Sequence, residues 1–322
     1  PNPYSRTPGD IDVWIDASRE RIMEYAQKKF ELGDDIRLQH LETSLDGVPV
    51  ELHFFPCSMN NPIYHARLQK WFRRNADLQC SHIVGLPDGA GDIAIPTTAF
   101  NVIYQLTHLY HHFFDEGIGM RQIIDYFLVV NDFSKNVFLN NDLSNPSVSL
   151  SKGSSTAFPK PLSPQGTGDV TALRCSEPLR YKDGGPSKVS PDCAEWDRLR
   201  GNGNTTSTAL DVVQRELKYL GLWKFAGAVM YVLHKALGLP EEKMMAPMDE
   251  KRGKLLLAEI LNGGNFGRHF TKYGHFTQQG MAKKYFLKIW RNMHFVRYYP
   301  AEALSEPIFR TWHFFWRLKH RR

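Results

Sequence analysis

The stretch Gly9-Asp10-Ile11-Asp12-Val13-Trp14-Ile15 alternates acidic and apolar side chains near the start of the 322-residue chain. A period of two is typical of a half-buried β-strand, in which residues i and i+2 point to the same face. Asp10 and Asp12 are therefore predicted to project side by side, with Ile11 and Val13 on the other face. Two neighbouring carboxylates repel each other unless a cation lies between them, and Mg²⁺ prefers one or two carboxylates plus substrate phosphates. The stretch thus predicts a strand that ends in a metal site.

The residues that follow predict a compact α+β unit. Ser18 is a suitable N-cap for a helix that runs to about Leu32, because its hydroxyl can accept from backbone N–H groups. Two strand-like runs come next, at Ile36–Thr43 and Val48–Phe55, and the Asp46-Gly47 pair between them indicates a hairpin because glycine tolerates positive φ. The predicted order is strand, helix, strand, turn and strand.

A third acidic residue lies on the last of these strands. Apolar residues share one of its faces, whereas Glu51 and His53 lie on the other. If the hairpin pairs with the first strand, Glu51 joins Asp10 and Asp12. Three such acids can hold two metal ions ~3.5–4 Å apart, which clamps the attacking and leaving oxygens in phosphoryl transfer. Glu51 is then the candidate general base for an acceptor hydroxyl. The competing interpretation is a solvated acidic strand end, which an isolated Asp-x-Asp also fits.

The rest of the chain is predicted to be mainly helical. Apolar periodicity indicates helices over residues 62–74, 96–116, 120–130, 208–220, 223–237, 251–262, 280–295 and 302–320.

One long segment differs in composition from these helices. From about 141 to 206, Ser, Pro, Gly, Lys, Asn and Thr dominate and the periodicity disappears, which predicts a low-complexity, disordered insertion. We therefore divide the chain into an α+β core at 1–60, a helical part at 61–140 that closes the cleft, the insertion at 141–206, and a C-terminal helical domain at 207–322.

Composition indicates the compartment and the class of partner. Hydrophobic residues make up 42% of the chain, but no apolar run reaches the roughly 20 residues that span a bilayer. No signal-peptide pattern is visible, and four cysteines without metal-type spacing suit a reducing compartment, so the expected location is the cytoplasm. The net charge of +6 favours partners that carry phosphate or other anionic groups.

Several segments resemble a known family. The run from Pro1 to Trp14 resembles the R-x-x-GDID motif of uncharacterised bacterial nucleotidyltransferases in the DNA-polymerase-β superfamily. Val50-Glu51-Leu52-His53 is similar to the third-acid strand of that family. Gly117-Ile118-Gly119-Met120-Arg121-Gln122-Ile123-Ile124-Asp125 resembles its helical-domain signature, and Leu220-Gly221-Leu222-Trp223-Lys224-Phe225-Ala226-Gly227 is similar to a further segment. The resemblance covers nearly all of the chain except about 140–206.

The resemblance implies a fold, a reaction and a set of site residues. The fold is a small mixed β-sheet core followed by a mainly α-helical domain. The reaction transfers a nucleoside monophosphate from a nucleoside triphosphate (NTP) to an acceptor hydroxyl, with two Mg²⁺ ions held by Asp10, Asp12 and Glu51. The acceptor could be a small molecule, a sugar, a protein or RNA. The residues expected to contact the nucleotide are Arg6, Gly9 and Arg121.

Some of these assignments have competing interpretations. Arg6 also fits an exposed loop, and Arg121 also fits an ion pair with Asp125. The superfamily places a Gly-rich turn, which holds the triphosphate, upstream of the first aspartate, but only nine residues precede Asp10. Because the first residue is Pro1 rather than Met, we expect the N-terminal part of the core to be missing from this chain.

Two further features suggest binding sites. His108 and His112 have the i, i+4 spacing that can place two imidazoles on one metal, although packed or solvated histidines are the commoner outcome on a helix. Between Arg310 and Arg322 there are five basic residues, no acid and two tryptophans. That helix could pack on its own domain, which we favour, or contact an anionic membrane surface or nucleic acid.

The leading hypothesis is therefore a Mg²⁺-dependent nucleotidyltransferase. The main alternative is a non-catalytic nucleotide-sensing or protein-interaction module with the same fold, which the absence of the Gly-rich turn favours. A third hypothesis, an RNA-binding protein, rests on the net charge and the aromatic and basic C-terminus.

Overall fold

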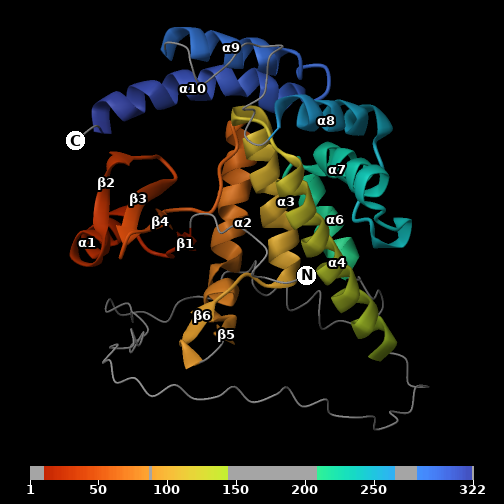
Figure 1. Ribbon diagram of the computed structural model, residues 1–322, viewed down its shortest axis with the longest axis horizontal. Helices are drawn as coiled ribbons and strands as arrows, with labels where there is room; N and C mark the ends of the chain where they lie inside the picture. Colours follow the sequence, from red (N-terminus) through yellow and green to blue (C-terminus); the bar gives the residue numbers. More distant parts are fainter. Residues whose placement is uncertain (1–10, 87–88, 144–208, 265–280, 321–322) are drawn as a thin grey trace.

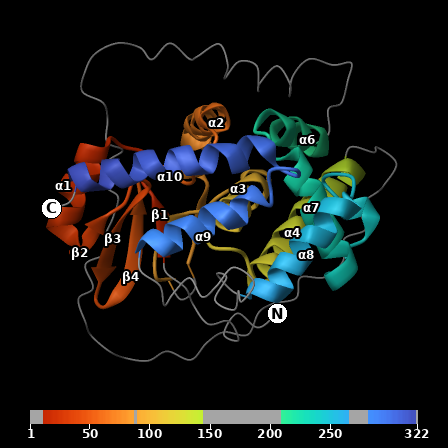
Figure 2. The same ribbon diagram turned by 90° about the horizontal axis from the view of Figure 1, so that it is seen from above.

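A computed structural model describes residues 11–86, 89–143, 209–264 and 281–320. A small sheet with one helix lies to one side of a larger group of helices, and the long helix α10 (Pro300–His320) extends over both (Figures 1 and 2). The predicted α+β class, a mixed sheet followed by a mainly helical region, is confirmed.

The sheet has four strands in the spatial order β1-β4-β3-β2. Strand β1 (Ile11–Trp14) runs parallel to β4 (Val48–His53), and β4 pairs in turn with β3 (His40–Leu45) in the antiparallel sense. Strand β2 (Glu31–Ile36) completes the sheet beside β3. The helix α1 (Arg19–Lys29) connects β1 to β2. The predicted hairpin therefore pairs with the first strand.

The turn of this hairpin has the predicted chemistry, but the strand predicted at Ile36–Thr43 is β3, at His40–Leu45, and β2 is an additional strand that was not predicted. Asp46 and Gly47 have φ of 52° and 76°, the pair of positive angles that a two-residue hairpin turn requires. We expected the first helix to continue to Leu32, whereas β2 already begins at Glu31. The sequence of β2 lacks the alternation of apolar and polar residues that indicates a strand, because Gly33 is followed by two acids. At Gly33 a Cβ atom would lie 3.1 Å from the Glu42 carbonyl oxygen, so a side chain there would require the neighbouring strand to shift by a few tenths of an ångström.

A small core lies between α1 and the sheet. Its buried members are Ile22, Ala26, Leu41, Val50 and Leu52. The hydroxyl of Ser18 accepts from the Arg21 N–H at 3.4 Å, so the predicted N-cap is present.

The apolar residues of β1 are more exposed than a half-buried strand would have them. Ile11 and Val13 are 50% and 36% exposed. Among the strands that the structure describes, β1 pairs with β4 alone, and the small core is centred on α1, β3 and β4. An edge strand of this kind leaves its apolar side chains partly in solvent.

The helical part contains the predicted helices, but those predicted at 62–74 and 120–130 extend to Ser81 and Leu143, the latter into the start of the predicted insertion. Its helical elements are α2 (Pro62–Ser81), α3 (Thr98–Asp115), α4 (Met120–Leu143), α6 (Ala209–Tyr219), α7 (Trp223–Leu237), a short 3₁₀ helix (Glu241–Lys243), α8 (Glu250–Gly263), α9 (Met281–Met293) and α10. A two-stranded ribbon, β5 (Ile83–Gly85) with β6 (Asp92–Ala94), was not predicted. The proposed insertion lies almost entirely in 144–208, outside the described residues, so that expectation stays a prediction.

A large aromatic core fills the helical part and reaches the sheet through one residue. Trp71 of α2 stacks on Phe100 of α3 with ring centroids 4.6 Å apart. Trp14, at the end of β1, lies parallel to Phe100 at 6.4 Å and tilted against Phe72 at 6.1 Å. The strand that carries Asp12 is therefore held against the helices immediately after that residue.

Helix α10 has a packed face and an exposed face. Ala303, Glu302 and Glu306 are buried, whereas Ile308 and Phe315 are 74% and 63% exposed. Packing thus explains one face only, and contact of the other face with a membrane or nucleic acid stays a prediction. Among the described residues, no helix is both long enough and apolar enough to cross a bilayer.

A buried carboxylate on α10 holds the segment that links the sheet to α2. Glu302 accepts hydrogen bonds from the backbone N–H groups of Asn60, at 2.5 Å, and Asn61, at 3.2 Å. Asn61 in turn caps α2 by accepting from the N–H groups of Ile63 and Tyr64. Burial raises the pKa of Glu302 to about 7. The folded protein consequently favours the protonated form of this side chain.

Glu302→Gln should flatten the dependence of stability on pH. Because the pKa of Glu302 is about 7 when folded and near 4.5 when unfolded, its contribution to the free energy of unfolding is largest at low pH and falls as pH rises through 7. We expect the difference in the free energy of unfolding between parent and variant, measured by urea unfolding, to change by about 2 to 3 kcal/mol between pH 5 and pH 8. Glu241→Gln, at an exposed position, is the matched control. Parallel pH profiles for the parent and Glu302→Gln would contradict the assignment.

Candidate active site on the sheet

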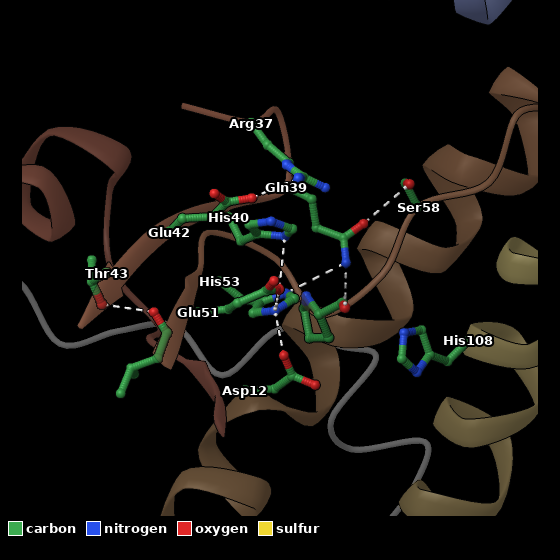
Figure 3. A network of polar contacts seen from close by, with 12 residues as sticks. Asp12, Arg37, Gln39, His40, Glu42, Thr43, Glu51, His53, Ser58 and His108 are labelled. Atoms are coloured by element: carbon green, nitrogen blue, oxygen red, sulfur yellow. Dashed lines mark hydrogen bonds and ion pairs between the residues drawn. The ribbon is translucent and has the colours of Figure 1, made fainter. Parts of the chain in front are cut away.

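The strand register places Asp12 directly opposite Glu51. The parallel pairing of β1 with β4 aligns these two residues, and the antiparallel pairing of β3 with β4 aligns His40 with His53. Residues that alternate along β4 share a face, so Glu51 and His53 point the same way. Four ionisable side chains thus converge on one face of the sheet (Figure 3).

His53 lies between the two carboxylates. Its Nε2 atom is 3.1 Å from Asp12 Oδ1 and 3.3 Å from Glu51 Oε2. His40 approaches Glu51 from the neighbouring strand, with Nδ1 at 3.2 Å from the same Oε2 atom. Side-chain exposure is 41% for Asp12, 22% for Glu51 and 6% for His53, so the site opens to solvent on the Asp12 side.

The charges in this cluster are strongly coupled. Burial disfavours the charged form of His53, but its hydrogen bonds to Asp12 and Glu51 and their negative charges raise the pKa of His53 to about 9. The same contacts outweigh burial at the two acids and lower the pKa of both. Burial lowers the pKa of His40 to about 4, which makes that imidazole neutral at physiological pH. The described cluster at neutral pH is therefore two carboxylates, one imidazolium and one neutral imidazole.

Two polar side chains connect this cluster to the helices. The Gln39 amide nitrogen donates to the Pro56 carbonyl at 3.1 Å and lies 3.4 Å from His53 Nδ1. Ser58 donates to the Gln39 amide oxygen at 3.3 Å, and its hydroxyl is 3.5 Å from His111 Nδ1 on α3. Gln39, which precedes β3, thus contacts His53 and is itself held by Pro56 and Ser58 of the segment that follows β4.

The histidines of α3 form a second group across from Asp12 (Figure 3 shows His108). The Nε2 atoms of His108 and His112 are 2.9 Å apart, so one ring donates to the other. Burial lowers the pKa of His108 to about 3 and that of His112 to about 4. Both rings are therefore neutral, and they bond to each other as packed histidines do.

A shallow cavity of about 400 Å³ adjoins Glu51 on the face of the sheet. The side chains and backbone that line it come from β2, β3 and β4 and include Glu31, Gly33, Glu42, Ser44 and Pro49. The lining contains no basic residue, so the cavity favours neutral or cationic groups over phosphates.

The structure brings together only part of the predicted site. Asp12 and Glu51 adjoin one another through His53, as the strand pattern required. Asp10, Gly9 and Arg6 lie outside the described residues, so their roles stay predictions. Arg121 is exposed on the first turn of α4, and the hydrogen bonds and ion pairs of Asp12 and Glu51 do not involve it.

The sequence reasoning missed the two histidines of the cluster. His53 was placed on the face of Glu51 without a role, and His40 was overlooked because it is polar and begins a strand. The signal was available in the hairpin itself. An Asp46-Gly47 turn fixes the register, and counting back from it pairs residue 40 with residue 53.

The N-terminal part of the chain matches a known family model. Residues 1–144, which contain the sheet and α2 to α4, match the family model described as an uncharacterised nucleotidyltransferase. This part of the chain, which is less than half of its length, is similar to a nucleotidyltransferase family. No curated protein and no solved structure matches the chain significantly. The matched segment contains Asp12, Glu51 and both histidines of the cluster.

Asp12→Asn should lower the pKa of His53. The raised pKa of about 9 depends on two carboxylates, so removing one charge should move it towards 6.5, by at least about one pH unit. Protonated His53 contributes to the free energy of unfolding below about pH 6.5, and this contribution is lost as pH rises through 9. The free energy of unfolding of Asp12→Asn should therefore fall less over that pH range than that of the parent. An NMR titration of histidine ring protons in the presence of a chelator measures the shift.

The exposed Asp92→Asn is the matched control for this titration. A His53 pKa that stays at its parent value in Asp12→Asn would show that the two side chains are not coupled in solution.

Proposed function

We propose that the protein transfers a nucleoside monophosphate from a nucleoside triphosphate to an acceptor hydroxyl, using Asp12, Glu51 and the neighbouring Asp10. The observation that carries this proposal is the β1–β4 register, which sets Asp12 opposite Glu51 inside a segment that matches a nucleotidyltransferase family. A solvated strand end has no need for a second acid on the next strand.

The carboxylates have the chemistry that a divalent metal requires. Asp12 and Glu51 have lowered pKa values and are ionised at neutral pH, and they share one face of the sheet. Oxygen ligands of this kind suit Mg²⁺, and we propose that Asp10, Asp12 and Glu51 hold two such ions. When bound, Mg²⁺ ions neutralise charge on the phosphate oxygens.

The reaction forms one bond and breaks one bond at the α-phosphorus. The acceptor oxygen bonds to the α-phosphorus, and the bond from that phosphorus to the bridging oxygen of the β-phosphate breaks. Pyrophosphate leaves with the electron pair of the broken bond. The proton of the acceptor hydroxyl passes to Glu51, which is ionised and therefore able to take it.

The nucleotide and the acceptor would approach the acids from different sides. We assign Arg6, Gly9 and Arg121 to the nucleotide, as the family resemblance implies. The acid-lined cavity beside Glu51 repels a triphosphate, so it suits the acceptor rather than the donor. An acceptor in this cavity would have its hydroxyl beside the proposed general base.

One observation favours the second candidate function, a nucleotide-sensing module without catalysis. His53 already supplies a positive charge between Asp12 and Glu51, so these carboxylates have a counter-charge in the absence of a metal. In a transferase, metal and nucleotide must displace or rearrange this contact. In a sensor, the contact could persist.

Thermal unfolding of the full chain with each NTP, with and without Mg²⁺, tests the binding step. A ligand at a hundred times its dissociation constant adds about 2.7 kcal/mol to stability, which shifts the unfolding midpoint measurably. We expect a shift that needs both Mg²⁺ and one preferred NTP, is absent in Asp12→Asn, and persists in Asp92→Asn. The absence of a shift with any nucleotide would refute nucleotide binding at this site.

Pyrophosphate release with the stabilising NTP separates the two candidate functions. The transferase should release pyrophosphate when acceptor-containing extract is added, and Glu51→Gln, which removes a proposed metal ligand and the proposed general base, should lose this release. A thermal shift without release under any condition would favour the sensing module.

A further inference from the structure

We propose that His40, Glu51 and His53, with Asp12 beside them, bind a divalent transition ion of the Zn²⁺ and Co²⁺ type. This site would be chemically distinct from the Mg²⁺ that accompanies a triphosphate. The inference extends the proposed function because the two share Asp12 and Glu51, but it depends only on the side chains of the sheet.

The distances within the cluster match those between ligands of one metal ion. Ligand atoms about 2.1 Å from an ion lie about 3.0 to 3.4 Å from each other in octahedral or tetrahedral geometry. The separations from Glu51 Oε2 are 3.2 Å to His40 Nδ1 and 3.3 Å to His53 Nε2, and Asp12 Oδ1 lies 3.1 Å from the latter. The potential ligand atoms of His40, Glu51 and His53 all lie within 4.8 Å of one another. Small side-chain movements would place one ion among them.

The ligand set selects the kind of ion. Two imidazole nitrogens and one or two carboxylate oxygens suit borderline transition ions, whereas Mg²⁺ is bound by oxygen and keeps several waters. A cluster of carboxylates alone would favour Mg²⁺. His40 and His53 therefore change the preference of a site that already contains the acids of the transferase.

Among the described residues, the His40 ring contacts Glu51 and the ring of His53, whose centroid is 5.0 Å away. Both ring nitrogens of His40 are buried, and neither makes a well-directed hydrogen bond, although Nδ1 lies 3.2 Å from Glu51. A buried polar atom without a hydrogen bond costs free energy, so such atoms usually mark a missing ligand or water. Here the nearest charged group is the carboxylate that would share the ion.

Gln39 is placed to supply, after rotation of its amide, the outer contact that a metal-binding histidine requires. A histidine that binds metal through Nε2 carries its proton on Nδ1 and donates it to a neighbouring oxygen. The Gln39 amide is 3.4 Å from His53 Nδ1, at present through its nitrogen. Rotating the amide by half a turn presents its oxygen to the ring, at the loss of the hydrogen bond to Pro56. Metal binding should therefore be accompanied by reorientation of Gln39.

Titration of Co²⁺ into the chelator-treated full chain, with no nucleotide present, tests the site. Co²⁺ in a site with nitrogen ligands gives visible absorption bands whose intensity reports the coordination number. We expect saturable bands, displacement by Zn²⁺, and no displacement by a tenfold excess of Mg²⁺. His40→Ala should weaken Co²⁺ binding at least about tenfold, since even loss of an outer contact has an effect of that size.

Two further variants complete the test, one as a control and one that removes a second proposed ligand. His294→Ala removes an exposed histidine near the end of α9 and should bind Co²⁺ like the parent. His53→Gln should lose binding as His40→Ala does, and the thermal midpoint of each variant shows that it is folded. Equal Co²⁺ affinity in folded His40→Ala and parent protein, or displacement of Co²⁺ by the Mg²⁺ excess, would overturn the proposal.

The outcome is independent of the proposed function. If the full chain binds no Co²⁺ but Mg²⁺ and an NTP still raise its unfolding midpoint, only the transition-metal site is refuted. Conversely, Co²⁺ binding that depends on His40, in a protein that no nucleotide stabilises, would refute only the transferase.

Discussion

Two carboxylates held opposite each other on adjacent parallel strands are the constraint on which the rest of the site depends. While the sheet is intact, the hydrogen bonds of β1 and β4 hold Asp12 and Glu51 opposite each other. Their mutual repulsion must be offset by positive charge. In the described structure His53 offers that charge, and the surrounding residues serve to place this one ring. Gln39 orients it, Ser58 orients Gln39, and the hairpin sets His40 beside it.

The site also depends on how the sheet is joined to the helices. Trp14 follows Asp12 by two residues and packs on Phe72 and Phe100, so the position of β1 is tied to α2 and α3. On the other side, Glu302 of α10 binds the backbone of Asn60 and Asn61, just beyond β4. A residue more than 240 positions away in the sequence thus positions the segment that follows the strand of Glu51. These two connections set the distance between Asp12 and the histidines of α3.

Patterns with a local cause could be predicted from the sequence, and contacts that depend on register could be predicted only in part. The Asp46-Gly47 turn, the Ser18 cap and the inward Val50 and Leu52 follow from φ preferences, capping and alternation, and all are present. Strand β2 was missed because Gly33 and two acids lack strand propensity, and pairing with β3 overrides that preference. The bridging role of His53 was missed because it needs the positions of two strands at once. Glu302 could not have been paired with Asn60 from sequence, since nothing local connects them.

The two apolar cores differ in size, so the sheet should unfold locally more readily than the helical part. The core under the sheet has five buried members, whereas the helical core extends through most of the other elements. Backbone amides of β1 and β4 should therefore exchange with deuterium through partial openings that leave α3 and α7 closed. Asp12 and Glu51 would separate in such openings, so the side chains of the site are assembled by the less stable cooperative unit. Any ligand that bridges them would slow exchange in the sheet and leave the slowest amides of the helices unaffected.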